Sequence, residues 1–170
     1  MIAHHNVSTQ SFKSPIGELI IGSYKDKLCL CDWRYRRMRT RIDKRIQSSL
    51  NATYIEQNSS VIEHAIAVLR AYFANELTQF ELPLLMLGTP FQQNVWSALL
   101  DIPYGKTNSY IDLARNIQNE KAVRAVASAN GANAISIIIP CHRVIGCKGE
   151  LTGYAGGLPA KKRLLALEQL

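Results

Sequence analysis

The segment Pro140-Cys141-His142-Arg143-Val144 constrains the fold most, because it directly follows the apolar run from Ile135 to Ile139. Such a run has to be buried, so the thiol and imidazole that follow it are presented from the interior. A cysteine attacks as its thiolate, and an unperturbed cysteine is mostly protonated at neutral pH. His142 and Arg143 supply a base and a positive charge next to the thiol. The segment therefore predicts a buried nucleophile at Cys141.

Length and charge leave several classes of protein open. The chain has 170 residues, enough for one domain or two small ones. Lysine and arginine exceed aspartate and glutamate by 20 to 13. This excess suits a polyanionic partner, but it also describes many proteins that never contact nucleic acid.

The cysteines and the apolar runs indicate the compartment. Four cysteines, two of them spaced as Cys29-Leu-Cys31, do not form a disulfide framework, because alternate residues of one strand rarely bridge. The amino terminus lacks the pattern of a signal peptide, and no apolar run reaches membrane-spanning length. We therefore expect a cytoplasmic protein with no membrane partner.

The first half of the chain shows strand and helix patterns. Alternating apolar residues on both sides of residues 22–27 predict a β-hairpin with Asp26 and Lys27 at its turn. The basic stretch Arg34 to Arg41 fits a nucleic-acid patch, but a solvated helical face or loop is the commoner outcome for such a stretch. Apolar residues at helical spacing predict an amphipathic helix over Val61 to Asn75 that covers a small sheet.

A break at Leu82 to Gly88 separates this half from a helical second half. Helices are expected from Phe91 to Leu100, from the capping residue Ser109 to Arg115, and from Ala122 to Ala129. The last two form a helix-turn-helix pattern, although a generic helical bundle would give the same pattern.

The residues around Cys141 resemble the active-site region of the methylated-DNA–protein-cysteine methyltransferases of bacterial type, which remove alkyl groups from O6 of guanine. The matched motifs keep the family's order and spacing, and they are Gly88 to Gln93, Ile102-Pro-Tyr-Gly105, Ser109-Tyr110, Ala122 to Val126, Asn133 and Tyr154-Ala-Gly-Gly157. The resemblance covers the last half of the chain and is weak before it. One departure is Ala134, where many relatives have proline, and its loss frees the backbone there.

The resemblance implies an α/β (α+β) protein of two domains. Residues 1–87 would form a small ribonuclease-H-like domain. Residues 88–170 would form a helical domain of winged-helix type with a helix-turn-helix, and this domain would hold all the chemistry. Some members of the family bind a structural zinc, but His4, His5, Cys29 and Cys31 match no metal motif. We therefore expect core cysteines, no metal and no cofactor.

The resemblance also implies a role for each site residue. Cys141 would accept the alkyl group, His142 would take the thiol proton through a water, and Glu168 would orient the imidazole. Tyr110 would donate a proton toward the guanine, and Asn133 would hold the turn that bears Cys141. The remaining substrate contacts are expected from three residues: Val144, Tyr154 and Ala155. Arg143 is expected to make a structural ion pair.

For the DNA, the resemblance implies a monomer that rotates the damaged nucleotide out of the duplex. The second helix of the helix-turn-helix would enter the minor groove, with Arg124 filling the gap. The other residues expected to contact DNA are Ala125, Asn119 and Ala129. The substrate would be O6-alkylguanine, chiefly O6-methylguanine, with O4-methylthymine as a second candidate. Transfer would be irreversible, one alkyl group per molecule.

Three rival functions are considered. A relative that senses the lesion but has tryptophan in place of the cysteine is opposed by Cys141. A cysteine hydrolase using Cys141, His142 and Glu168 would leave Arg124 unexplained. A winged-helix regulator with an incidental cysteine would bind a specific operator without covalent change.

Overall fold

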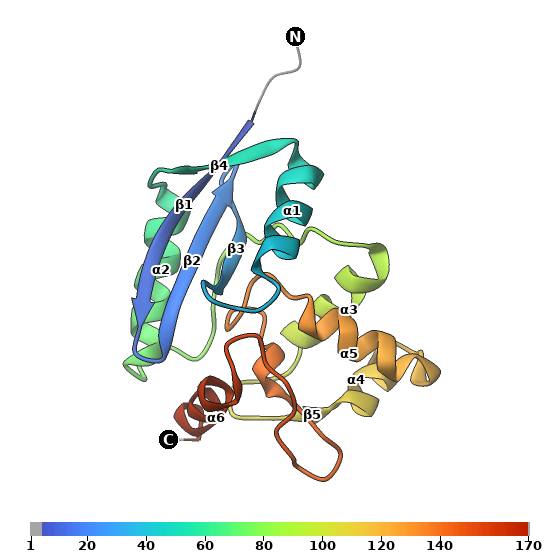
Figure 1. Ribbon diagram of the computed structural model, residues 1–170. Coiled ribbons are helices and arrows are strands. Elements are labelled where there is room, and N and C mark those ends of the chain that lie inside the picture. The colour runs from blue at the N-terminus through green and yellow to red at the C-terminus, as the bar shows by residue number, and fades with distance from the viewer. Residues whose placement is uncertain (1–4, 170) are drawn as a thin grey trace. The chain divides into compact units, whose positions relative to one another are not determined.

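The structure, a computed structural model, describes residues 5–169. The chain divides into two compact units, Met1–Leu87 and Gly88–Leu170, at the position where the sequence pattern breaks (Figure 1). A four-stranded sheet with two helices forms the first unit, and the second is mainly helical. The predicted α/β class is confirmed.

The first unit is built on a sheet with strand order β3-β2-β1-β4. Pairing is antiparallel between β1 and β2 and between β2 and β3, whereas β4 joins β1 in parallel. Figure 1 shows α1 along one side of this sheet and α2 along the other. The bounds are β1 (His5–Ser14), β2 (Gly17–Tyr24), β3 (Lys27–Trp33), α1 (Arg39–Leu50), β4 (Ala52–Glu56) and α2 (Ser60–Phe73).

The predicted hairpin is β2–β3, with its turn one residue earlier than expected. Lys25 and Asp26, with φ of 46° and 63°, form the turn, and Lys27 already belongs to β3. Positive φ at two successive residues is what a tight two-residue hairpin requires, and aspartate tolerates it well. The predicted amphipathic helix is α2, which Ser59 caps by accepting a hydrogen bond from the Ile62 amide.

The basic stretch is divided between buried and exposed arginines. Arg36 is buried and Arg39 is half-buried, whereas Arg34, Arg37 and Arg41 are exposed, as expected for a solvated face. Asp32 is fully buried and accepts hydrogen bonds from Arg36 at 3.0 and 3.1 Å and from Arg39 at 3.0 Å. Arg39 also pairs with Asp43, which accepts a bond from the Tyr54 hydroxyl at 2.8 Å. Burial raises the pKa of Asp32, and the two guanidinium groups oppose that rise. These arginines therefore connect β3 to α1.

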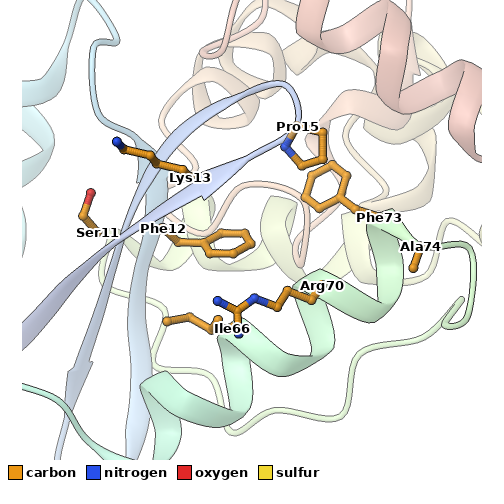
Figure 2. Close-up of a pocket in the computed structure, with 8 residues that line it drawn as sticks. All are labelled: Ser11, Phe12, Lys13, Pro15, Ile66, Arg70, Phe73 and Ala74. Atoms are coloured by element: carbon orange, nitrogen blue, oxygen red, sulfur yellow. The ribbon is translucent and has the colours of Figure 1, made fainter.

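A hollow of about 520 Å³ lies between β1 and α2 (Figure 2). Figure 2 shows the rings of Phe12, Phe73 and Pro15 on its walls, and the Arg70 guanidinium lies 5.8 Å from the centre of the Phe12 ring. The remaining lining residues are Ser11, Lys13, Ile66 and Ala74. Its lining contains no carboxylate, thiol or imidazole, and its polar side chains are those of Ser11, Lys13 and Arg70.

Cys29 and Cys31 are buried within β3, and burial raises the pKa of Cys29 to about 12. A buried, protonated thiol is a poor metal ligand. Among residues 5–169, no cluster of histidine, cysteine, aspartate and glutamate is arranged to hold a metal ion. His4 lies outside the described residues. None of the helices in the described part of the chain has the length and hydropathy needed to cross a bilayer.

The second unit packs helices around a two-stranded parallel pair of β5 and β6. Capping boxes at Thr89 and Ser109 start its first two helices, as the sequence predicts for Ser109. The Trp96 indole donates to the Ala129 carbonyl at 2.8 Å, which joins α3 to α5. The bounds are α3 (Pro90–Leu100), β5 (Asn108–Ser109), α4 (Tyr110–Asn116), η1 (Glu120–Ala122), α5 (Val123–Gly131), η2 (Cys141–Arg143), β6 (Val144–Ile145) and α6 (Leu158–Leu167).

The Asp32 network gives a stability prediction. Asp32→Asn leaves two guanidinium groups without their shared carboxylate, so we expect a loss of about 3 kcal/mol in the free energy of unfolding. Urea titration followed by circular dichroism measures this loss. Asp26→Asn, at the exposed β2–β3 turn, is the matched control and should unfold like the wild type. Equal midpoints for the two variants would contradict a structural role for the network.

Candidate active site

Cys141 begins the short helix η2, and its side chain is only 4% exposed. The loop before it is tightly hydrogen-bonded: the Ile139 amide donates to the Ile135 carbonyl at 2.9 Å, and the Cys141 amide donates to the Ile139 carbonyl at 2.8 Å. All five residues from 135 to 139 are buried. The apolar run therefore anchors the loop in the core and presents the thiol at a fixed place.

Asn133 holds this loop closed. Its side-chain nitrogen donates to the Ile139 carbonyl at 2.9 Å and to the Ile135 carbonyl at 3.4 Å, and its oxygen accepts from the Ile135 amide at 2.9 Å. The side chain is 2% exposed, so these bonds form away from competing water. The geometry is that of a residue holding the turn that bears Cys141.

The structure brings His142, Arg143 and Glu168 together in the interior. His142 Nε2 lies 2.8 Å from Glu168 Oε1. Arg143 donates to both Glu168 oxygens at 2.9 Å, and its third nitrogen donates to the Ile102 carbonyl at 2.7 Å. The side chains of His142 and Glu168 are 0% and 1% exposed. Arg143 thus makes the expected ion pair, and its partner is the carboxylate that contacts the imidazole.

Burial and charge set the protonation of this cluster. Burial lowers the pKa of His142, against the opposing effect of the Glu168 carboxylate. Burial by itself raises the pKa of Glu168, but the hydrogen bonds and charges of His142 and Arg143 overcome it and hold the pKa at about 2. We take His142 as neutral and Glu168 as ionised, with Arg143 supplying the countercharge.

This assignment fixes the tautomer of the imidazole. Nε2 has to carry the hydrogen that it donates to Glu168, so the lone pair is on Nδ1. Nδ1 is buried and has no hydrogen-bond partner among the described residues. Cys141 is the preceding residue in the sequence, and a buried basic nitrogen is suited to accept the proton of a thiol.

A second cluster surrounds Tyr110, the first residue of α4. Its hydroxyl lies 2.6 Å from the Thr152 hydroxyl. Lys161 of α6 is fully buried, and its ammonium donates to the Val144 carbonyl at 2.6 Å and to the Thr152 carbonyl at 3.3 Å. Burial lowers the pKa of Lys161, and the charge of ionised Cys141 raises it. Lys161 therefore connects β6 to the loop that follows it.

The other predicted substrate contacts lie on these same segments. Val144 is fully buried, and its carbonyl already accepts one hydrogen bond from Lys161, which leaves one lone pair for a ligand. Tyr154 and Ala155 are half-buried in the loop between β6 and α6. The Gly157 amide donates to the Tyr154 carbonyl at 2.9 Å, which tightens the loop before α6.

The residues predicted to contact DNA divide into two groups. Arg124, Ala125 and Asn119 are exposed, Arg124 and Ala125 on α5 and Asn119 just before η1. Ala129 is 2% exposed, and its carbonyl accepts the Trp96 bond, so it packs inside the unit. The prediction that Ala129 contacts DNA is wrong, because its side chain faces the core and not the outer face of α5.

Sequence reasoning missed Thr152 and Lys161. A lysine on a helix is usually solvated, and a threonine in a glycine-rich loop gives no chemical signal. The signal available for Lys161 was its helical spacing from Leu164 and Glu168, because residues three and seven apart share one helix face. Nothing in the sequence indicated the partner of Thr152.

Comparison with known proteins adds a family match for the second unit. Residues 90–170 match the family described as 6-O-methylguanine DNA methyltransferase, DNA binding domain. The methylated-DNA–protein-cysteine methyltransferase of Mycobacterium leprae is 44% identical over 166 residues, covering 96% of this chain and 93% of the relative. That of Methanosarcina acetivorans is 43% identical over 157 residues, covering 92% and 95%. The motifs led us to expect a similarity confined to the last half of the chain. The relatives instead match nearly its whole length.

Solved structures are also similar to this chain over most of its length. The crystal structure of Mycobacterium tuberculosis OGT in complex with DNA has a TM-score of 0.80 and 42% identity, covering 96% of this chain and 92% of that one. The O6-methylguanine-DNA methyltransferase of Methanococcus jannaschii has a TM-score of 0.63 and 25% identity, covering 95% and 93%.

The buried ion pair predicts a pH-dependent stability. The pKa of Glu168 is lowered from 4.5 to about 2 by folding, so its contribution is present above pH 4.5 and is lost as the pH falls toward 2. At pH 7, Glu168→Gln should cost about 3 kcal/mol, because it breaks a buried pair. Urea titrations from pH 7 to pH 3 should show this difference shrinking as the pH falls.

The control is Glu120→Gln, which removes an exposed carboxylate from the same unit. Its curve should follow that of the wild type across the range. A cost of Glu168→Gln that stays constant down to pH 3 would mean that the carboxylate is not held ionised by Arg143.

Proposed function

Because the chain belongs to the methylated-DNA–protein-cysteine methyltransferase family, we propose that it repairs double-stranded DNA by transferring the alkyl group of O6-alkylguanine to Cys141. This assignment rests on the buried neutral imidazole of His142, the residue that follows Cys141, which is oriented by Glu168 and Arg143. The relative from M. tuberculosis was solved in complex with DNA, which supports DNA as the partner.

The alkyl group of O6-alkylguanine lies inside the duplex, so the nucleotide has to rotate out of the stack before it can reach Cys141. Arg124 is exposed on α5, next to the small residue Ala125. A long cation on a helix that approaches DNA closely is suited to fill the space left by the base. We infer that α4 and α5 form a helix-turn-helix that binds the minor groove, largely without regard to sequence.

The transfer step follows from the cluster around Cys141. His142 Nδ1 takes the thiol proton, through a water if the two side chains do not meet, and the thiolate attacks the alkyl carbon. The carbon–oxygen bond breaks, the electron pair stays on O6, and Tyr110 donates a proton toward the guanine. Glu168 stabilises the imidazolium that forms. Because His142 starts neutral with a lowered pKa, the base remains available at neutral pH.

A thioether is a poor leaving group, so the alkylated Cys141 has no route back to the thiol within this site. We infer one transfer per molecule. The same in-line attack applies to an alkyl group on O4 of thymine, which makes O4-methylthymine a second candidate substrate. The ribonuclease-H-like and winged-helix descriptions of the two units, and a monomeric state, are part of the same proposal.

Mass spectrometry tests the transfer directly. The protein is mixed with excess duplex carrying one O6-methylguanine, and the intact mass and the peptides are measured. We expect one methyl group per molecule, on the peptide that contains Cys141, and none on Cys141→Ala. Cys147, which is exposed, serves as an internal control for unspecific methylation.

A protein that binds this duplex and stays unmodified would contradict the transfer and favour a lesion sensor or a regulator. Release of a modified product with repeated turnover would favour a hydrolase. Undamaged duplex should give no modification at all.

The role of Arg124 is tested by Arg124→Ala. If Arg124 fills the gap left by the base, the transfer rate on O6-methylguanine duplex should fall by about tenfold, whereas binding to undamaged duplex should weaken less. Arg41→Ala, an exposed arginine of α1, is the matched control for loss of charge. An equal loss for damaged binding, undamaged binding and transfer would reduce Arg124 to a phosphate contact.

A further inference from the structure

The contact between Tyr110 and Thr152 is short and has no place in the transfer step described above. The two hydroxyl oxygens lie 2.6 Å apart, and both residues are half-buried. A distance this short is typical of a well-formed hydrogen bond between hydroxyl groups. Either oxygen can be the donor, so the geometry leaves two directions for the bond, with opposite consequences for the phenolic proton.

Thr152 is itself held in place. Its carbonyl accepts from the Lys161 ammonium at 3.3 Å, and the same ammonium donates to the Val144 carbonyl at 2.6 Å. Val144 in turn pairs with Asn108 in the parallel contact of β5 with β6, two residues before Tyr110. Lys161 therefore links Thr152 to Val144 of β6, and the pairing of β6 with β5 links Val144 to the segment that precedes Tyr110.

We propose that Thr152 is a positioning residue for the alkyl transfer, whose hydroxyl donates to the phenolic oxygen of Tyr110. This inference rests on the proposed function. With one lone pair of the phenol occupied by Thr152, the phenolic hydrogen points away from Thr152 and is available to the guanine. Held by the buried Lys161, the loop keeps this orientation before the substrate arrives.

The hydrogen bond also strengthens during the reaction. As the carbon–oxygen bond breaks, guanine keeps the electron pair and takes the proton of Tyr110, so negative charge moves to the phenolic oxygen. A hydroxyl that donates to a charged oxygen binds more strongly than one that donates to a neutral oxygen. The phenolate then recovers a proton, in net the one that His142 took from Cys141, so no proton is gained or lost.

The opposite direction of the bond makes the opposite prediction. If Tyr110 donates to Thr152, the phenolic proton is occupied and has to be released before transfer. Removing the Thr152 hydroxyl would then speed the reaction. The sign of the change in rate therefore decides between an orienting threonine and one that blocks the proton.

The test compares Thr152→Val, which keeps the shape and removes the hydroxyl, with Thr152→Ser, which keeps the hydroxyl. Transfer of the methyl group from O6-methylguanine duplex is measured under single-turnover conditions at saturating protein. We expect Thr152→Val to be slower by about tenfold and Thr152→Ser to keep most of the rate. Affinity for the damaged duplex should change little, because the bond acts on the transfer step.

A double-mutant cycle separates this role from a structural one. In a Tyr110→Phe background the phenol is absent, so Thr152→Val should cause no further loss. The reactivity of Cys141 with iodoacetamide, measured without DNA, should be unchanged in Thr152→Val. Thr40→Val, which removes an exposed hydroxyl from α1, controls for the substitution itself.

Each outcome decides the inference. An unchanged or faster rate for Thr152→Val, or a loss that persists undiminished in Tyr110→Phe, overturns it. If Thr152→Val does not fold, Thr152→Ala takes its place with the same expectation. A wild type that transfers no methyl group contradicts the proposed function itself, whereas a normal wild type with unaffected variants contradicts only the role of Thr152.

Discussion

The buried ion pair of Arg143 and Glu168 is the interaction on which the site depends. It joins η2 to the end of α6, and it holds the carboxylate ionised in the interior, where His142 donates to it. An ion pair of this kind adds little stability over a well-packed apolar pair, because two charges have to be desolvated. Its contribution here is electrostatic, since a fixed carboxylate selects one tautomer of His142 and leaves the lone pair on Nδ1.

Around that pair, the second unit gathers polar groups from segments far apart in the chain. Tyr110 follows β5, Cys141 precedes β6, and Lys161 and Glu168 lie on and just after α6. The two residue pairs that join β5 to β6 link the segment before Tyr110 to the segment that follows Cys141. Because Lys161 and Glu168 are seven residues apart, one face of one helix supports both clusters.

The sequence predicted elements wherever the signal was local. Ser109 as a helix cap, the amphipathic helix α2 and the burial of Cys141 follow from neighbouring residues. The sequence did not predict the network of Asp32, because an ion pair across a turn looks like a run of surface charge. It also placed Ala129 on the wrong face, since alternating small residues do not reveal which face packs against Trp96. The partners Glu168 and Thr152 depend on tertiary contacts, so only resemblance, or the structure itself, reveals them.

The loop before Cys141 affects how the order of the second unit depends on temperature. In relatives that have proline after the asparagine equivalent to Asn133, the proline ring restricts the backbone of the unfolded loop. This covalent restriction changes little with temperature. Ala134 gives no such restriction, so here the order of the loop depends on the hydrogen bonds of Asn133 and on burial of the isoleucines. Ordering this loop on folding therefore costs more backbone entropy than it does with proline at that position. Because the entropic cost grows with temperature, the order of the loop depends more on Asn133 as the protein is warmed.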